Sequence, residues 1–365
     1  MFMYKFSRVS DSEFSAFNNF IGDFPHGNFR QTTHWGEIKK ASGWNYACYA
    51  LKYNDAFVAT ALILIRNIIK LPFSLLYCCR GPVVDWSNSD HVAALFDGLK
   101  DVVMQHNGLC LRFDPEPASI FTGVEECLFN HGVVKLPDRV TTWNRALYST
   151  RVLLNESEDQ LFKNMRRTHR QNINKSIKSG VSVGTDASPG DKDIFFNLIC
   201  GLELRRNSLI HSKDYYDSIY NNTVGQSRGF FLKAIYNDEV ISGLVVTMVG
   251  NRAWALYLAN DYNYRKIMPN KLLLWKAIKI AREHGCKFVD FGSTQGTDSF
   301  DPKADSLDNL KSAYRPTIVN YPGYYDLVSR FYHGFRLAEQ RLLPFALSNY
   351  FKLQRFSGLL KREQD

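Results

Sequence analysis

Alternating apolar and polar positions predict two hairpins that resemble each other closely. The first lies in YALKYNDAFVATALILI and the second in LKAIYNDEVISGLVVTM, and both turn on the tripeptide Tyr-Asn-Asp. The tripeptide occupies residues 53–55 in the first copy and residues 236–238 in the second, about half the chain later. An Asn-Asp pair between strands rich in β-branched residues is typical of a tight hairpin turn. We therefore predict two copies of a strand–turn–strand unit.

The segments that follow the two hairpins repeat in the same order. After one further strand, residues 91–106 have the apolar spacing of an amphipathic helix, and the strand LCLRF then leads into Asp114. In the second half, the strand WALYLA precedes a helical pattern over residues 270–284, and KFVDFG carries Asp290. The repeated order predicts an α/β chain with mixed sheets, built from two similar domains.

The chain length agrees with that division, because 365 residues are more than one core usually needs. We place the first domain at residues 1–150, the second at residues 151–330 and a C-terminal basic and aromatic helical segment at residues 331–365. A content of 45% hydrophobic residues is that of a well-packed globular protein.

The second domain is expected to begin with a basic helix over residues 156–180, which Gly180 ends. No acidic residue follows Asp159 in this segment, and its basic residues are Lys163, Arg166, Arg167, Arg170, Lys175 and Lys178. Such a face is either a solvated helix surface or a surface that contacts the phosphates of RNA or of a nucleotide. Salt-dependent association with RNA would separate the two interpretations.

From Asp326 onward, basic and aromatic residues alternate in a helical pattern. This pattern is typical of a segment that rests on an anionic membrane surface, and equally of a terminal helix packed on its own domain. The net charge of +9 favours anionic partners. The longest apolar stretch, residues 57–65, is too short to span a bilayer. We expect a monomeric cytoplasmic protein, with peripheral contact at the inner face of the membrane as the open alternative.

Several common catalytic sites have no counterpart in the sequence. It contains no GxSxG, HExxH, GxxxxGK[ST] or GxGxxG motif, and its nine histidines lack metal-ligand spacing. Its seven cysteines form no CxxC pair, which favours reduced structural thiols. We therefore expect neither a metal nor a cofactor.

The strand, loop and helix over WALYLA, NDYNYRKIMP and NKLLLWKAIKIAREHG resemble the core of the GNAT acyltransferases. In that superfamily a glycine-rich loop before the helix wraps the pyrophosphate of coenzyme A. The loop of this chain contains Tyr262, Tyr264, Arg265, Lys266 and Pro269 but no glycine. Ordinary coenzyme A binding is therefore not expected.

A narrower resemblance covers residues 30–330. The segments THWGEIK, RGPVVD, RRTHRQNINKSIKSGVSV, KLLLWKAIKIAREHGCKFVDFG, LDNLKSAYRP and GYYDLV occur in the order found in the FemAB family, and are most similar to its FemX-like members. The resemblance implies two tandem GNAT-like domains without a coiled-coil arm. It also implies transfer of an amino acid from aminoacyl-tRNA to an amine of a nucleotide-linked or lipid-linked peptidoglycan precursor, which requires neither ATP nor a metal.

The resemblance assigns basic residues to the diphosphate of the precursor. Lys39 lies in the WxxxK pattern that begins at Trp35, and either Arg205 or Arg206, in LELRRNS, matches a family arginine with the same role. Arg80 lies in the matching RGPV loop. A surface lysine and a structural arginine are the alternative interpretations of Lys39 and Arg80.

The resemblance also assigns the reaction centre. Asp114 matches a family carboxylate near the acceptor amine, where it could accept a proton, although it could instead cap a turn before Pro115. Tyr257 and Trp254 match substrate-facing aromatic residues, with core packing as the alternative.

Lys311 matches the lysine that holds the acceptor and stabilises charge on the reacting carbonyl. The sequence departs from the family pattern around it, since Leu310 replaces a phenylalanine and Tyr314-Arg315 replaces Phe-Gly. The stretch over residues 293–306 suggests a remodelled loop over the site.

Two rival functions remain open. One is a GNAT-like N-acyltransferase that uses an acyl thioester in polysaccharide or cell-envelope synthesis, which coenzyme A binding would reveal. The other is a non-catalytic assembly factor that binds precursor or nucleic acid, and it would gain support if changes at Lys311 and Asp114 had no effect.

Overall fold

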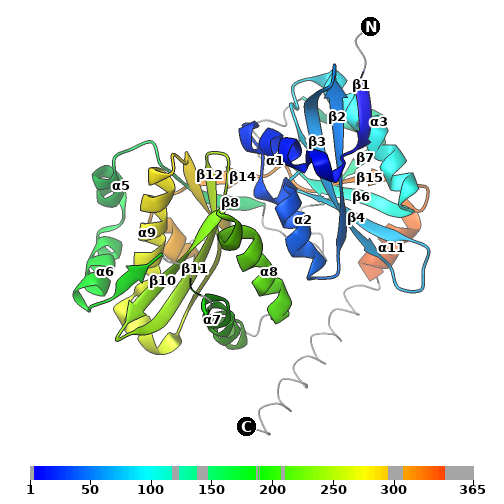
Figure 1. Cartoon of the computed structure of the whole chain (residues 1–365). Helices are drawn as coiled ribbons and strands as arrows, with labels where there is room; N and C mark the ends of the chain where they lie inside the picture. The colour runs from blue at the N-terminus through cyan, green and yellow to red at the C-terminus, as the bar shows by residue number, and fades with distance from the viewer. Residues whose placement is uncertain are drawn as a thin grey trace.

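The computed structural model describes residues 4–116, 123–137, 147–185, 188, 190–206, 210–294 and 307–341, apart from the side chains of residues 206, 307 and 308. Figure 1 shows two sheets side by side, each with helices against it. The predicted loop over residues 293–306 lies mostly outside the described residues, as do residues 342–365 of the C-terminal segment.

The first sheet has the order β1-β2-β3-β4-β6-β15-β7, with β5 paired to β3. Its strands are β1 (Tyr4–Arg8), β2 (Asn45–Tyr53), β3 (Ala56–Asn67), β4 (Ser74–Cys79), β5 (Val83–Val84), β6 (Gly108–Asp114), β7 (Val133–Lys135) and β15 (Tyr325–Val328).

The second sheet has the order β14-β8-β13-β12-β11-β10-β9. Its strands are β8 (Tyr148–Leu153), β9 (Ser182–Gly184), β10 (Gly229–Tyr236), β11 (Glu239–Val249), β12 (Arg252–Asn260), β13 (Phe288–Thr294) and β14 (Thr317–Asn320).

The two sheets repeat one topology. In each, a hairpin (β2–β3 or β10–β11) is followed by one further strand, a helix and a strand parallel to that further strand. The parallel pairs are β4 with β6 and β12 with β13, and every other neighbouring pair in the described sheets is antiparallel. The connecting helices are α3 (Ser89–Gln105) and α9 (Pro269–Glu283). The predicted duplication is therefore present in the fold.

The repeated Tyr-Asn-Asp tripeptides form the same turn in both hairpins. Asn54 and Asp55 have φ values of 50° and 64°, and Asn237 and Asp238 have φ values of 49° and 64°. Two consecutive left-handed residues make the turn that matches the twist of paired strands, and Asn and Asp tolerate that conformation. Each hairpin also has a register shift close to its turn. The predicted hairpins are confirmed.

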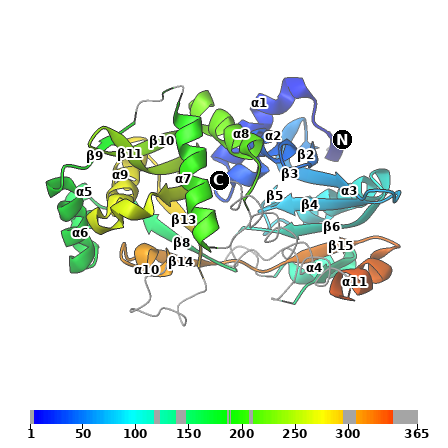
Figure 2. The same ribbon diagram turned by 90° about the horizontal axis from the view of Figure 1, so that it is seen from below.

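The remaining helices surround the sheets (Figure 2). They are α1 (Phe14–Asp23), α2 (Thr33–Lys40), α4 (Glu125–Asn130), α5 (Glu158–Asn164), α6 (Arg167–Lys178), α7 (Asp191–Arg206), α8 (Lys213–Thr223), α10 (Leu307–Ser312) and α11 (Tyr332–Arg341), with 3-10 turns η1 (Asp11–Glu13), η2 (Phe29–Gln31), η4 (Val224–Gln226) and η5 (Tyr262–Ile267). No helix in the described part of the chain is long and apolar enough to cross a membrane.

The predicted basic helix over residues 156–180 is two helices, α5 and α6, because the chain is extended at Met165 with ψ 156°. Met165 is buried in the core of the second domain, and the guanidinium of Arg170 donates to the Met165 carbonyl at 2.8 Å. The apolar spacing continues across this break, so periodicity alone does not reveal it. Gly180 follows α6 with φ 89°, as predicted.

The first sheet contains one strand from the end of the described chain, whereas the second sheet is built from the consecutive strands β8 to β14. β15 lies between β6 and β7 in the first sheet, whereas the predicted boundary at residue 330 assigned it to the second domain. The buried guanidinium of Arg112 on β6 holds β15 and α11 on the first sheet, since it donates to Asp326 of β15 and to Glu339 of α11. The described part of the C-terminal segment is therefore packed on the first domain.

A joint apolar core connects the two domains. It contains Phe17, Phe29 and Trp35 from the first half together with Phe195 and Trp254 from the second. Separate clusters fill the space between each sheet and its crossing helix. The domains therefore share an extensive buried interface, which holds residues from both at fixed distances.

Candidate active site

The parallel strands β12 and β13 separate partway along the second sheet. They pair only from Arg252–Phe288 to Trp254–Asp290, whereas β4 and β6 stay paired to the end of both strands at Cys79–Asp114. A register shift between Val245 and Val246 of β11 gives β12 an extra residue at this point. An extra residue bends a strand and increases its local twist. The second sheet is therefore split where the first remains paired.

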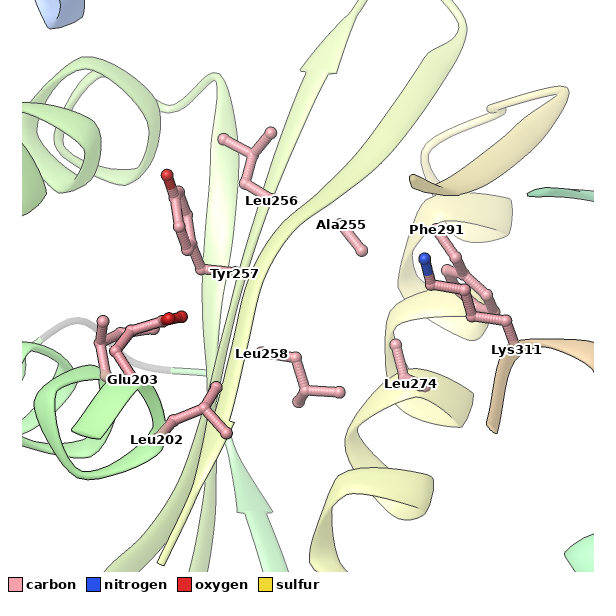
Figure 3. Close-up of a pocket in the computed structure, with 10 residues that line it drawn as sticks. Leu202, Glu203, Ala255, Leu256, Tyr257, Leu258, Leu274, Phe291 and Lys311 are labelled. Atoms are coloured by element: carbon pink, nitrogen blue, oxygen red, sulfur yellow. The ribbon is translucent and has the colours of Figure 1, made fainter. Parts of the chain in front are cut away.

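A cavity of about 150 Å³ occupies this split (Figure 3). Its lining is mostly apolar, with one carboxylate and one ammonium: Ile199, Leu202, Glu203, Ala255, Leu256, Tyr257, Leu258, Leu274, Phe291 and Lys311. Figure 3 shows Tyr257 and Glu203 on one side of β12, and Phe291, Leu274 and Lys311 on the other. A mostly apolar pocket with a few polar groups is the usual form of a ligand site.

Lys311 lies on α10 and is only 4% exposed. Its Nζ donates a hydrogen bond of 2.6 Å to the carbonyl of Ser293. Ser293 lies in the part of β13 that is no longer paired with β12. The chain then turns at Arg315, whose φ of 50° explains why glycine suits this position in the family pattern. Strand β13 and this turn thus hold an ammonium at the wall of the cavity, and its role in stabilising a developing oxyanion stays a prediction.

A chain of aromatic and basic side chains connects the first domain to the cavity. The Nζ of Lys39 lies 5.2 Å from the ring centroid of Tyr215, and the hydroxyls of Tyr215 and Tyr257 are 3.4 Å apart. Burial raises the pKa of Tyr257 well above its usual value, so this hydroxyl stays protonated. The rings of His211 and Tyr215 are tilted against each other at 4.3 Å, and burial followed by the charge of Lys39 lowers the pKa of His211. Lys39 and Tyr257 are therefore brought together through a residue that the sequence did not single out.

Arg80 and Asp114 form a buried pair at the ends of β4 and β6. The backbone N–H of Arg80 donates to Asp114 Oδ1 at 2.8 Å, and Arg80 Nη1 lies 3.5 Å from Oδ2. The Tyr77 hydroxyl donates to Asp114 at 3.0 Å, and the Arg80 guanidinium stacks 3.4 Å from the ring centroid of Tyr321. Asp114 thus has the contacts of a structural carboxylate, and a role as proton acceptor stays a prediction.

The other predicted residues occupy different environments. Trp254 is buried between Phe29 and Phe288, at ring distances of 5.2 and 6.0 Å, in the core between the domains. Arg205 is exposed on α7, and its Nη2 donates to the Asn260 carbonyl at the end of β12. The side chain of Arg206 lies outside the described residues. Contact of these residues with substrate stays a prediction.

A buried ion network joins the domains beside Asp114. Arg151 on β8 donates to Glu116 of the first domain at 2.8 Å and to Asp290 of β13 at 2.9 Å. Asn28 donates to the other oxygen of Glu116 at 2.5 Å. The two carboxylates raise the pKa of Arg151 against the opposing effect of burial, so its charge is retained. This network fixes β13, and with it one wall of the cavity, relative to the first domain.

Sequence reasoning missed Glu203, Tyr215 and Arg151. Arg151 had a usable signal, because a charged residue inside the apolar strand pattern of STRVLL needs a buried partner. Asp290, in KFVDF, is a charged residue in the same kind of pattern. Glu203 and Tyr215 lie on helices whose burial depends on packing between the domains, and neither position has a comparable local signal.

His169 on α6 packs against the turn that follows α10, the helix that carries Lys311. It is 3% exposed, its ring lies 4.6 Å from the ring of Tyr314, and its Nε2 has no hydrogen-bond partner among the described residues. Burial, reinforced by the charges of Lys271 and Arg166, lowers the pKa of His169 to about 3. The folded protein therefore keeps this imidazole neutral at pH values where the unfolded chain protonates it.

This difference predicts a pH-dependent stability. Because the pKa of His169 is lower in the folded state, the unfolded chain binds one more proton between pH 6.5 and about 3. As the pH is lowered through this range, His169 should therefore reduce the free energy of unfolding by about 1.4 kcal/mol per pH unit. The His169→Phe variant should lose that part of the slope in urea unfolding measured at a series of pH values. Parallel curves for the variant and the wild type would contradict the prediction.

Comparisons with known proteins match both halves of the chain. A model described as the FemAB family matches residues 12–128, and a model described as an acetyltransferase (GNAT) domain matches residues 163–300. A lipid II:glycine glycyltransferase of Staphylococcus epidermidis is 24% identical over 353 residues, which cover 79% of this chain and 83% of the relative.

Two solved structures share the fold. A crystal structure of FemX has a TM-score of 0.82 at 19% identity, and the match covers 92% of this chain and 100% of that one. A tandem GNAT protein from the clavulanic acid biosynthesis pathway has a TM-score of 0.52 at 11% identity, with 89% and 98% covered. The predicted fold class, α/β with two tandem GNAT-like domains, is confirmed.

Proposed function

Because this chain is a FemX-like protein of the FemAB type with an acyltransferase domain, we propose that it transfers an amino acid from aminoacyl-tRNA to an amine of a peptidoglycan precursor. The named relative, a lipid II:glycine glycyltransferase, favours a lipid-linked muropeptide as the acceptor. The observation that carries the proposal is the split between β12 and β13, which places Lys311 in an apolar cavity. In this proposal the chain acts at the inner face of the membrane.

The reaction needs no further activation of the donor. The acceptor nitrogen attacks the ester carbonyl of the aminoacyl-tRNA, the ester C–O bond breaks, and the ribose hydroxyl leaves with a proton. Lys311 stabilises the oxyanion that forms on the carbonyl. A carboxylate takes the proton that the ammonium must lose, and Asp114 is the predicted acceptor. Glu203 is the carboxylate that lines the cavity itself.

The basic residues of the second domain favour an RNA donor. The glycine-free turn η5 places Arg265 and Lys266 directly before α9, and α6 packs against both elements. Lysine and arginine side chains bind the phosphates of a nucleic acid backbone. This arrangement supports aminoacyl-tRNA over an acyl thioester, because the backbone of a loop without glycine is less able to wrap a pyrophosphate.

The direct test is a transfer assay with mixed donors. Purified protein is incubated with a mixture of charged tRNAs and a lipid-linked muropeptide, and the product mass is measured. We expect the mass to increase by one amino-acid residue, and we expect acyl-coenzyme A to give no product. A gain with the thioester alone would favour the N-acyltransferase, and no gain with any donor would support the non-catalytic assembly factor.

Lys39 provides a second test, on acceptor binding. If its ammonium contacts the acceptor diphosphate, Lys39→Ala removes a charge-assisted hydrogen bond of about 1.5–3 kcal/mol. The KM for the acceptor should then rise at least about tenfold with kcat little changed. The matched control is Lys40→Ala, since Lys40 is exposed and pairs with Glu37 at 2.9 Å on the surface of the same helix. Equal KM values for both variants would remove Lys39 from the acceptor site.

A further inference from the structure

One end of the first sheet exposes an unusual set of apolar side chains. The turn between β3 and β4, residues 68–73, reads IIKLPF, with Ile69 86% exposed and Leu71 56% exposed. Lys70 lies between them with φ 65°, so the turn has a left-handed residue at its tip. Large apolar residues at the tip of a turn add nothing to the core of their own domain.

A second segment lies against this turn. The rings of Phe73 and Phe331 are 4.8 Å apart, and the guanidinium of Arg330 lies 4.6 Å from the centroid of the Phe331 ring. Figure 1 shows α11, which begins directly after Phe331, beside β4 and β6. Leu337 on α11 is 52% exposed. The turn and residues 330–331 therefore lie side by side, and α11 continues from them. Exposed residues of these two segments are here named the apolar-basic patch: residues 69–71, Arg330, Phe331, Leu337 and Arg341.

The charge of the patch has one sign. Residues 68–73 and 330–341 contain a single acidic residue, Glu339. Glu339 is 3% exposed and accepts hydrogen bonds from Arg112 and Arg336. The exposed charges on these segments are Lys70, Arg330 and Arg341. Exposed cations around exposed apolar residues complement an anionic interface with an apolar interior.

The patch is also held in place before any ligand arrives. The buried Arg112 contacts both oxygens of Asp326 and both oxygens of Glu339, so it fixes α11 to β6 and β15. The Ser329 hydroxyl donates to the Leu109 carbonyl at 2.6 Å, at the start of β6. The position of α11 on the first sheet is therefore set by buried polar contacts, and docking through this helix costs little conformational entropy.

We propose that the apolar-basic patch docks the protein on an anionic phospholipid surface, with Ile69 and Leu71 inserted among the acyl chains. Lys70, Arg330 and Arg341 then lie at the level of the lipid phosphates. The proposal rests on the proposed function in one respect, since a lipid-linked acceptor would bring the enzyme to such a surface. The docking surface belongs to the first domain and lies outside the cavity at β12 and β13.

The test uses the full chain and two kinds of vesicle, one of phosphatidylglycerol and one of phosphatidylcholine. We expect the wild type to sediment with phosphatidylglycerol vesicles and much less with phosphatidylcholine. Ile69→Ser with Leu71→Ser should weaken binding at least about tenfold, because two exposed apolar side chains lose their burial. The matched control is Ile177→Ser, since Ile177 is 53% exposed on α6 of the second domain. This control should bind within about twofold of the wild type.

A second double variant, which changes charges, keeps the test decisive if the Ile69→Ser and Leu71→Ser variant fails to fold. Lys70→Glu with Arg330→Glu changes two exposed side chains and should also abolish the preference for phosphatidylglycerol. The proposal is overturned if both double variants sediment like the wild type, because the patch would then not be the surface that binds lipid. It is also overturned if the wild type binds both kinds of vesicle equally.

Transfer activity separates this proposal from the proposed function. With a water-soluble UDP-linked muropeptide, the Ile69→Ser and Leu71→Ser double variant should react within about twofold of the wild type, because the patch lies outside the cavity. With an acceptor embedded in phosphatidylglycerol vesicles, its rate should fall with its binding. A wild type that binds vesicles but transfers nothing would overturn the proposed function and leave docking supported. Equal rates for the variant and wild type on embedded acceptor would count against docking.

Discussion

The Lys311→Ala variant should lose transfer activity by about 10²–10³-fold, the usual effect of removing one donor that stabilises an oxyanion. Lys311 Nζ is held at the cavity wall by its hydrogen bond to Ser293. Since the oxyanion exists only in the transition state, kcat and kcat/KM should fall by the same factor. Steady-state rates with saturating donor measure both quantities.

The control for this prediction is Lys100→Ala, since Lys100 lies partly exposed on α3, outside the cavity, and pairs with Asp97 at 3.0 Å. Lys311→Met retains most of the buried volume and should be as inactive as alanine. Thermal unfolding of both Lys311 variants shows whether the fold is retained. A Lys311→Met enzyme that is folded and within about threefold of the wild type would exclude the assigned role.

Arg151→Met should lower the free energy of unfolding by about 3–5 kcal/mol, because it leaves the carboxylates of Glu116 and Asp290 buried without their cation. Arg151 is the residue that joins these carboxylates across the two domains. The loss should also release β13 from the first domain, so transfer activity should fall along with stability. Urea unfolding followed by circular dichroism measures the effect on stability.

A surface pair provides the comparison. Lys279→Met breaks a partly exposed ion pair with Glu158 and should cost less than about 1 kcal/mol. Adding Glu116→Gln and Asp290→Asn to Arg151→Met removes the uncompensated charges and should recover part of the lost stability. If Arg151→Met were no more destabilising than Lys279→Met, the network would not hold the domains together.

Local chemistry made the hairpins predictable. The Asn-Asp pairs determine the turns through their own backbone preferences, and the alternating residues around them determine which face is buried. The helices α3 and α9 follow from their apolar spacing for the same reason. Duplication could be recognised because these local signals occur twice in the same order.

The split between β12 and β13 could not be predicted from the local sequence of either strand. It depends on a register shift relative to β11 and on Gly292, which has φ 82° in β13. The equivalent strands of the first sheet stay paired although their sequences have a similar apolar pattern. The return of β15 to the first sheet is a second example, because YDLV carries no information about which sheet it joins.

The arrangement of the polar site residues also could not be predicted from local sequence. Lys39, Tyr257 and Lys311 were assigned through family resemblance, and the structure places Tyr257 and Lys311 at one cavity with Lys39 joined to it through Tyr215. Tyr215 belongs to α8, which meets α2 only after the domains have packed. The apolar pattern around Arg151 indicates a buried partner, but only the three-dimensional structure shows that this partner is Glu116 of the other domain.

The central claim is that amide formation occurs in the split of the second sheet. The most direct measurement is a crystal structure of the protein with a stable conjugate that joins an aminoacyl-adenosine to the amine of a muropeptide. We expect the transferred carbonyl oxygen between β12 and β13, at hydrogen-bond distance from Lys311 Nζ. A conjugate bound elsewhere, for example in the polar groove lined by His34, Glu37 and Arg228, would contradict the account.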